Sequence, residues 1–327
     1  MILVRVLLGF LIFSSFFRVA LGQDDNVITI KTAIVRLNVG VVDRTGKPVL
    51  NLKREDFSVY EDGVRQSILK FEPSETPFSV VLLLDMSGST ISFRQTIKTA
   101  AIRFIEALSP HDRVAVVEFY DKINLRNDFT TDRKTIINSI NVSNGRGKTQ
   151  LYKALDFALD KLEKENSSRK AIIVLTDGVD TDLRDKDRQL FAKLGAENLS
   201  IDMQKDETLN RILLKAQRQG VSIYPLALPT GDPALLPDPT PLQVALYKAA
   251  RERLELLAKN SGASLTKINR IEELGRIYAS VAAEIRTLYT IEYQPSNDRF
   301  DGKWRTIRIE VSDPSLIART KPGYYAK

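Results

Sequence analysis

The stretch "FSVVLLLDMSGST", residues 78–90, contains the strongest structural signal in the sequence. It opens with an almost unbroken apolar run, which is typical of a strand buried on both faces in a parallel sheet. The run ends in Asp85, and Ser87 and Ser89 follow at alternate positions, so an extended turn would direct all three side chains to one spot. In an open α/β sheet, ligands bind just beyond the carboxyl ends of such strands. We therefore expect a binding site at these three residues.

Strand and helix patterns alternate around this stretch, from residue 78 to residue 288. Further apolar strands are predicted at "RVAVVEFYD" (113–121), "KAIIVLTDG" (170–178) and "VSIYPLAL" (221–228), with amphipathic helices between them. This alternation predicts an α/β fold, with a doubly wound and mostly parallel sheet that helices cover on both sides.

The two flanking segments, residues 27–75 and 289–326, contain only short strand patterns and turns. Asp62 and Gly63 lie between two of these strands, which is a hairpin signal. Neither segment has enough strands to bury a core by itself, because a lone hairpin is marginal in water. We therefore expect the two segments to form one small all-β domain beside the α/β domain of residues 78–288.

A second polar stretch, "SNGRGKTQLYKAL" at residues 143–155, looks at first like the end of a nucleotide-binding P-loop. A P-loop needs a glycine five residues before the glycine of Gly-Lys-Thr, and a buried strand leading into it. Val142 occupies that position and the lead-in is polar. We therefore expect no nucleotide here. Thr149 instead precedes a predicted helix, in a loop between two of the parallel strands.

The Asp85-x-Ser87-x-Ser89 pattern, Thr149 in its glycine-flanked loop, and Asp177 in a Thr-Asp-Gly sequence follow one another along these predicted strands. Together they resemble the von Willebrand factor A domain, in which the five positions form a metal-ion-dependent adhesion site. The resemblance implies that Ser87, Ser89 and Thr149 supply hydroxyl ligands. It also implies that Asp85 and Asp177 coordinate directly or through water. The implied cofactor is Mg²⁺, with Mn²⁺ or Ca²⁺ as alternatives, since such hard cations prefer oxygen ligands.

The resemblance to this domain covers about residues 78–288, and the flanks resemble something narrower. "REDFSVYEDGVRQSI" (54–68), "YTIEYQPSN" (289–297) and "GKWRTIRIEV" (302–311) are similar to a group of exported bacterial proteins called VWFA-related, which are abundant in acidobacteria. Lys148 departs from the pattern, because a second glycine is common at that position. Lys148 could repel the cation, help to hold an acidic ligand, or simply point to water.

The first 22 residues, "MILVRVLLGFLIFSSFFRVALG", combine a basic residue, an apolar run and the small residues Ala20 and Gly22. This pattern is typical of a secretory signal peptide, with cleavage expected before Gln23. An uncleaved anchor is the alternative, but the run is short for a membrane span and Arg18 interrupts it. We expect an exported chain, periplasmic or secreted, with no transmembrane segment after cleavage.

Composition narrows the function classes further. The net charge is +7, and two of the positive residues lie within residues 1–22. The remaining excess is mild and lacks Lys or Arg runs, which argues against nucleic-acid binding. The chain has no cysteine and one histidine, His111, so disulfides, thiol catalysis and a zinc cluster are not expected. The acid-rich "DGVDTDLRDKD" (177–187) lacks the central glycine and closing glutamate of a calcium loop, and we expect a solvated loop there.

These observations lead to one expected function and two alternatives. We expect an exported, non-enzymatic module that binds a partner protein in a metal-dependent way, with an acidic oxygen of the partner completing the metal coordination. An envelope assembly factor or enzyme that uses the site to position a substrate is the first alternative. A structural module whose metal position is filled by Lys148 is the second.

Overall fold

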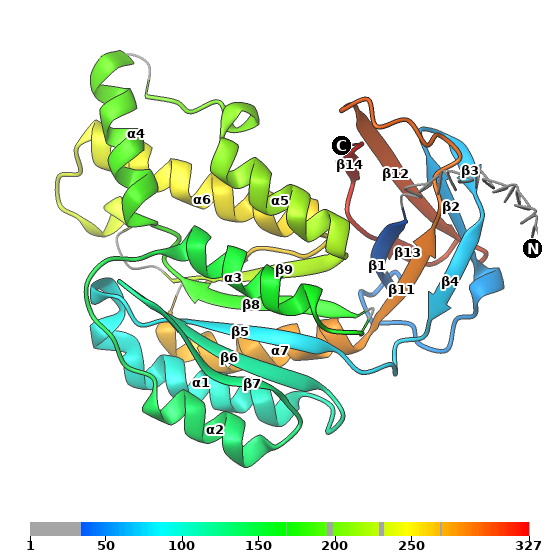
Figure 1. The fold of residues 1–327 in the computed structure, drawn as a ribbon, viewed down its shortest axis with the longest axis horizontal. Helices are drawn as coiled ribbons and strands as arrows, with labels where there is room; N and C mark the ends of the chain where they lie inside the picture. Colours follow the sequence, from blue (N-terminus) through cyan, green and yellow to red (C-terminus); the bar gives the residue numbers. More distant parts are fainter. Residues whose placement is uncertain (1–33, 168, 195–198, 229–231, 269, 327) are drawn as a thin grey trace, which may run out of the picture. The chain divides into compact units, whose positions relative to one another are not determined.

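The computed structural model of the chain describes residues 34–167, 169–194, 199–228, 232–268 and 270–326. The expected signal peptide and residues 27–33 lie outside these ranges. Figure 1 shows a layered α/β region and a separate group of antiparallel strands. Among the described residues, no helix has the length and apolar character needed to cross a membrane.

The α/β region is built on a six-stranded sheet in the order β10-β9-β8-β5-β6-β7. All neighbours in this sheet pair in parallel except β6 and β7, which are antiparallel. The strand predicted from the apolar run is β5, at the centre of the sheet, and all of its residues are buried. The doubly wound, mostly parallel sheet is thus confirmed. The strands are β5 (Ser79–Asp85), β6 (Arg113–Phe119), β7 (Ile123–Thr130), β8 (Lys170–Thr176), β9 (Val221–Ala227) and β10 (Thr266–Lys267).

Helices cover both faces of this sheet (Figure 1). On β5, Val80 and Leu82 belong to one apolar core and Val81 and Leu83 to the other, because successive side chains of a strand point to opposite faces. The first core includes α1 (Arg94–Ala107), α2 (Arg133–Val142) and α7 (Leu274–Arg286). The second includes α3 (Leu151–Glu163), α4 (Thr181–Leu194), α5 (Glu207–Gln219) and α6 (Pro241–Ser261).

Helix α4 corrects one expectation. The acid-rich sequence at 177–187 was expected to form a solvated loop, but a helix begins within it at Thr181. Asp187 of this helix is buried and accepts two hydrogen bonds from the guanidinium of Arg253 on α6, at 2.6 and 2.8 Å. Leu183 and Phe191 are buried beside it. The helix therefore docks through an ion pair as well as through apolar contacts, and local composition did not reveal the partner arginine.

The strands outside the α/β region form two four-stranded antiparallel sheets, in the orders β13-β1-β11-β4 and β14-β12-β2-β3. A single apolar core contains residues of both sheets, and each sheet mixes N-terminal with C-terminal strands. This confirms the small all-β domain expected from the two flanks. The strands are β1 (Val35–Val42), β2 (Phe57–Glu61), β3 (Val64–Gln66), β4 (Ile68–Glu72), β11 (Leu288–Tyr293), β12 (Trp304–Val311), β13 (Ile317–Arg319) and β14 (Gly323–Tyr325).

The predicted hairpin lies between β2 and β3. Asp62 and Gly63 both have positive φ angles, 47° and 83°, as the tight turn of a two-residue hairpin requires. The C-terminal flank contains four short strands, where the sequence indicated about two. Strands β13 and β14 have three residues each, which is too short for a period-two pattern to stand out.

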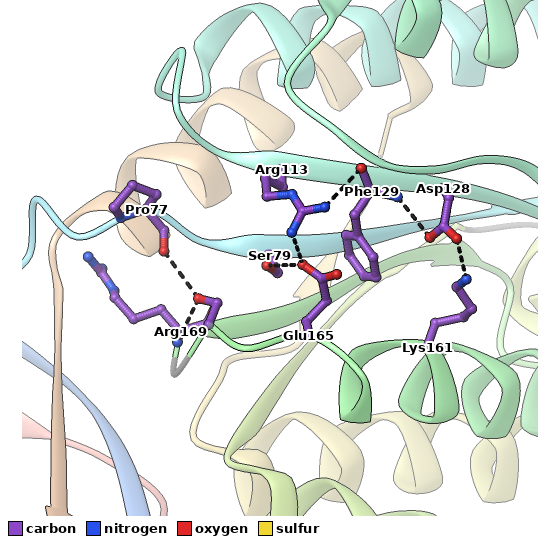
Figure 2. A network of polar contacts seen from close by, with 9 residues as sticks. Pro77, Ser79, Arg113, Asp128, Phe129, Lys161, Glu165 and Arg169 are labelled. Atoms are coloured by element: carbon purple, nitrogen blue, oxygen red, sulfur yellow. Dashed lines mark hydrogen bonds and ion pairs between the residues drawn. The ribbon is translucent and has the colours of Figure 1, made fainter.

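Arg169 connects the α/β region to the two segments through which the chain enters and leaves it. Its buried guanidinium donates to the carbonyl oxygens of Ser74 (2.6 Å) and Leu288 (2.7 Å), and also to those of Pro73, Thr76 and Ile285. Figure 2 shows the neighbouring polar contacts at this end of β5, where Glu165 accepts hydrogen bonds from Ser79 (3.1 Å) and Arg113 (2.7 Å).

Candidate metal centre

The first loop of the site leaves the carboxyl end of β5. One carboxylate oxygen of Asp85 accepts a hydrogen bond from the Ser87 amide at 3.0 Å. The Thr90 hydroxyl donates to the carbonyl oxygens of Asp85 (2.9 Å) and Ser87 (3.1 Å), which closes the turn. The hydroxyl oxygens of Ser87 and Ser89 lie 3.1 Å apart. The alternation seen in the sequence thus brings two hydroxyls together beside a buried carboxylate, with Ser89 exposed.

The second loop, residues 143–149, lies against the first. The Gly88 amide donates to the Gly147 carbonyl at 3.0 Å. A Cβ at Gly145 would overlap the ring of Tyr120, and one at Gly147 would displace the carboxylate of Asp121. Gly147 also has a φ of +93°, a region that favours glycine. The loop therefore follows one path, and this path leads to Thr149.

The third loop follows β8 and contacts both of the others. The Thr176 hydroxyl donates to the second carboxylate oxygen of Asp85 at 2.9 Å. The Thr149 amide donates to the Thr181 hydroxyl at 3.0 Å, and the Thr181 amide donates back to the Thr149 carbonyl at 2.9 Å. Asp177 lies between these contacts and accepts from the Val179 amide at 3.0 Å. The three loops are thus linked in a closed circle around the predicted site.

The electrostatics of the site are those of two neighbouring buried acids. Asp85 is fully buried and Asp177 is 4% exposed. Burial, together with the negative charge of Asp177, raises the pKa of Asp85 from 3.8 to about 7, while hydrogen bonds from Ser87 and Thr176 oppose the shift. Two carboxylates that share a poorly solvated place repel each other, and a cation between them would remove that repulsion.

The donor atoms fit a hard divalent cation. Two carboxylates and the three hydroxyls of Ser87, Ser89 and Thr149 are all oxygen donors, the kind that Mg²⁺, Mn²⁺ and Ca²⁺ accept. In the part of the chain that is described, no group of three or more His, Cys, Asp or Glu side chains could hold a metal ion. This site has two acids, so a metal here would also need the hydroxyls as ligands.

Lys148 lies next to Thr149 and its side chain is exposed. Its backbone amide donates to Asp121 at 2.7 Å, which contributes to the path of the second loop. The exposure agrees with the interpretation that Lys148 points to water, and an exposed lysine can also meet a partner.

Several residues that shape the site had not been identified from the sequence. Thr176 and Thr181 hydrogen-bond directly to Asp85 and Thr149, and Asp121 and Arg94 hold the second loop. The two glycines of "SNGRG" were the only sequence signal of this packing. What they pack against lies on another strand connection, which the sequence alone does not identify.

The fold and these loops define a doubly wound α/β domain with an oxygen-lined site at the carboxyl edge of its sheet. Residues 80–179 match the family model described as "von Willebrand factor type A domain". The matched range includes Asp85, Thr149 and Asp177, and the chain thus contains a von Willebrand factor type A domain, as the resemblance predicted. No curated protein matches the chain.

The chain is also similar to several solved structures. The vWF domain of the type V pili tip protein Mfa5 from Porphyromonas gingivalis is 16% identical, with 64% of this chain and 95% of that chain covered and a TM-score of 0.48. A von Willebrand factor type A protein from Catenulispora acidiphila is 13% identical, with 91% and 74% covered and a TM-score of 0.47. The pilus adhesin SpaC from Lactobacillus rhamnosus GG is 12% identical, with 86% and 49% covered and a TM-score of 0.48.

Proposed function

We propose that this protein is an exported, non-enzymatic module that binds a partner protein through a divalent cation. The observation that carries the proposal is the closed circle of three loops. In this circle the buried Asp85 lies close to the charge of Asp177, and the hydroxyls of Ser87 and Ser89 lie together. The Thr149 amide is hydrogen-bonded to Thr181 in the third loop. Such an arrangement is costly without a cation, because burial disfavours the charged form of each acid.

Ser87, Ser89 and Thr149 would hold the cation through their hydroxyls, and Asp85 and Asp177 through their carboxylates or an intervening water. The cation would supply a Lewis-acidic position for an acidic oxygen of the partner. Ser89 is the exposed member of the set, so a partner would approach from its side. Mg²⁺ is the proposed ion, with Mn²⁺ or Ca²⁺ able to replace it.

Two features support a binding role over a catalytic one. A general base must lie within hydrogen-bond reach of the reacting proton, and His111, the only histidine, lies in the turn before β6. This turn is at the opposite end of the sheet, since the neighbouring Asp112 accepts from the amide of Phe78 ahead of β5. Both carboxylate oxygens of Asp85 already accept hydrogen bonds from Ser87 and Thr176.

Export is proposed from the signal-peptide pattern of residues 1–22. Sequencing of the N-terminus of the protein recovered outside the cytoplasm should give Gln23. Recovery of a chain that still begins at Met1 would favour the membrane-anchor alternative.

Calorimetry with Mg²⁺ tests the metal part of the proposal. The wild-type chain should bind one ion, and Asp85→Ala should bind none while it keeps the wild-type circular dichroism spectrum. Asp132→Ala is the matched control, since Asp132 caps the first turn of α2 away from the site and is exposed. Wild-type protein that takes up neither Mg²⁺ nor Mn²⁺ would overturn the proposal.

Capture of proteins from an envelope extract tests the binding part. Partner retention on the immobilised wild-type chain should require Mg²⁺ and disappear in EDTA, and Asp85→Ala should retain nothing above background. A partner that is retained equally with and without EDTA would show that the metal face is not the binding site.

A further inference from the structure

Arg94, near the start of α1, lies between the first two loops of the site. One end of its guanidinium, Nη2, donates to the Gly145 carbonyl at 2.7 Å and to the Met86 and Ser87 carbonyls at 3.2 and 3.4 Å. The other end, Nη1, donates to the Asn144 side-chain oxygen at 2.6 Å. One side chain thus contacts the backbone of a proposed ligand, Ser87, and the loop that ends in Thr149.

The second loop is held from its other side by a buried acid. Glu118 of β6 is fully buried, and one of its carboxylate oxygens accepts from the Asn144 amide at 2.9 Å. Its other oxygen accepts from Arg126 at 2.5 Å and Asn124 at 2.9 Å. Asn144 is therefore fixed between Glu118 and Arg94, so a polar chain runs from β6 through the second loop to the first.

We infer that Arg94 is a positioning residue that sets the distance between the Ser87 and Thr149 hydroxyls. The inference rests on the proposed metal site. A planar guanidinium can hold several acceptors at once in fixed directions, which an ammonium on a flexible stem cannot do. Groups that orient metal ligands in this way typically change metal affinity about 10–100-fold when they are removed.

The charge of Arg94 and its positioning role predict opposite changes in Mg²⁺ affinity when the residue is replaced by alanine. A positive charge near a cation site disfavours the cation, so if charge were the main effect, Arg94→Ala would bind Mg²⁺ more tightly than the wild type. If position is the main effect, the same substitution loosens the two loops and binding weakens.

Mg²⁺ affinity should therefore be measured by calorimetry for the wild type, Arg94→Ala, Arg94→Lys and a control, Arg133→Ala. Arg133 is also half-buried at the start of a helix and donates to a loop carbonyl, that of Ser109, but it lies at the opposite end of the sheet. We expect Arg94→Ala to weaken binding about tenfold or more. The Mg²⁺ affinity of Arg94→Lys should lie between those of the wild type and Arg94→Ala. The affinity of Arg133→Ala should equal that of the wild type.

Amide exchange in EDTA supplies a second measurement that needs no metal. The Gly88 amide spans the two loops through its bond to the Gly147 carbonyl, so it should exchange faster in Arg94→Ala than in Arg133→Ala. Equal exchange of Gly88 in the two variants, or Mg²⁺ affinity that is unchanged or higher in Arg94→Ala, would overturn the inference. Failure of the wild type to bind Mg²⁺ would instead overturn the proposed function, and Gly88 exchange alone would then decide the role of Arg94.

Discussion

The buried charged groups at the two ends of β5 have contrasting surroundings. At the amino end, the guanidinium of Arg169 donates to five carbonyl oxygens and lies over the ring of Phe78, 4.2 Å from its centroid. At the carboxyl end, Asp85 accepts from one amide and one hydroxyl and faces a second carboxylate, that of Asp177. The amino end of β5 thus lies beside a buried cation that has five hydrogen-bond acceptors, and the carboxyl end carries a buried acid that a second acid repels.

This difference distinguishes a structural charge from a functional one. A buried charge that is surrounded by hydrogen-bond partners stabilises one arrangement of the chain, and removing it leaves those partners unpaired. A buried acid beside another acid has a raised pKa because its charged form is disfavoured in the free protein, and such groups concentrate at functional sites. The comparison predicts that substitutions at the two ends of β5 will have opposite consequences.

Arg169→Ala should have the largest effect. The substitution removes the donor that is shared by carbonyl oxygens of the two segments through which the chain enters and leaves the α/β region. We therefore expect the free energy of unfolding to fall by about 3–5 kcal/mol. Urea denaturation measures this change. Arg113→Ala is the control at the same end of the strand, since its salt bridge is half-exposed and should be worth at most about 1 kcal/mol. Similar losses for both variants would remove the contrast.

Mg²⁺ should stabilise the wild type by an amount set by its affinity. An ion present at one hundred times its dissociation constant adds about 2.7 kcal/mol to the free energy of unfolding. Asp177→Ala should lose this gain, yet in EDTA it should be at least as stable as the wild type, because the repulsion with Asp85 is gone. Asp177→Ala that unfolds more easily than the wild type in EDTA would place Asp177 with Arg169 as a structural charge.

Lys321 offers a third buried charge on which to extend the comparison. It is 3% exposed, and burial together with the charge of Arg36 lowers its pKa from 10.5 to about 8. The unfolded chain therefore binds more protons than the native chain between these values, so stability should rise as the pH increases from about 8 to about 10.5. The expected gain is on the order of 2–3 kcal/mol.

Substitution of Lys321 isolates this contribution from other titrating groups. Lys321→Met should remove the rise over that pH range when its urea midpoints are compared with those of the wild type. The nitrogen of Lys321 lies 5.8 Å from the centroid of the Tyr324 ring, so Tyr324→Leu should be measured beside it. An unchanged pH dependence in Lys321→Met would show that burial does not destabilise the charged form of Lys321.

Lys148→Ala should have the smallest effect. The side chain of Lys148 is exposed, so solvent and salt screen its charge, and we expect Mg²⁺ affinity to change by less than about threefold. Titration at low and high salt checks this expectation. Affinity that rises more than tenfold would favour the alternative in which Lys148 competes with the cation for the site.

Features whose signal is local could be predicted from the sequence. The apolar run of β5, the Asp85-x-Ser87-x-Ser89 alternation and the turn at Asp62 and Gly63 depend on neighbouring residues, and the structure has the strand, the clustered side chains and the hairpin there. The metal-ligand roles of the site residues stay predictions.

Features that depend on distant partners could not be predicted. Helix α4 is held partly by Asp187, whose partner Arg253 is 66 residues away. Arg169 donates to carbonyls 93 to 119 residues away, and Arg94 donates to a loop carbonyl 51 residues away. An isolated arginine among 48 basic residues carries no local sign of such a role, because the acceptors are backbone atoms that any sequence provides.

The pairing of β4 with β11 determines how the molecule would carry mechanical load. These strands lead into and out of the α/β region, and they are hydrogen-bonded neighbours, with Glu72 opposite Thr290 and Phe71 opposite Ile291. A pull applied between β1 and β14, the first and last described strands, therefore enters and leaves through the antiparallel sheets. The α/β region lies between β4 and β11 in the chain, so it forms a loop that the hydrogen bonds of the β4–β11 ladder close. We therefore expect the metal loops to stay free of tension until that ladder shears.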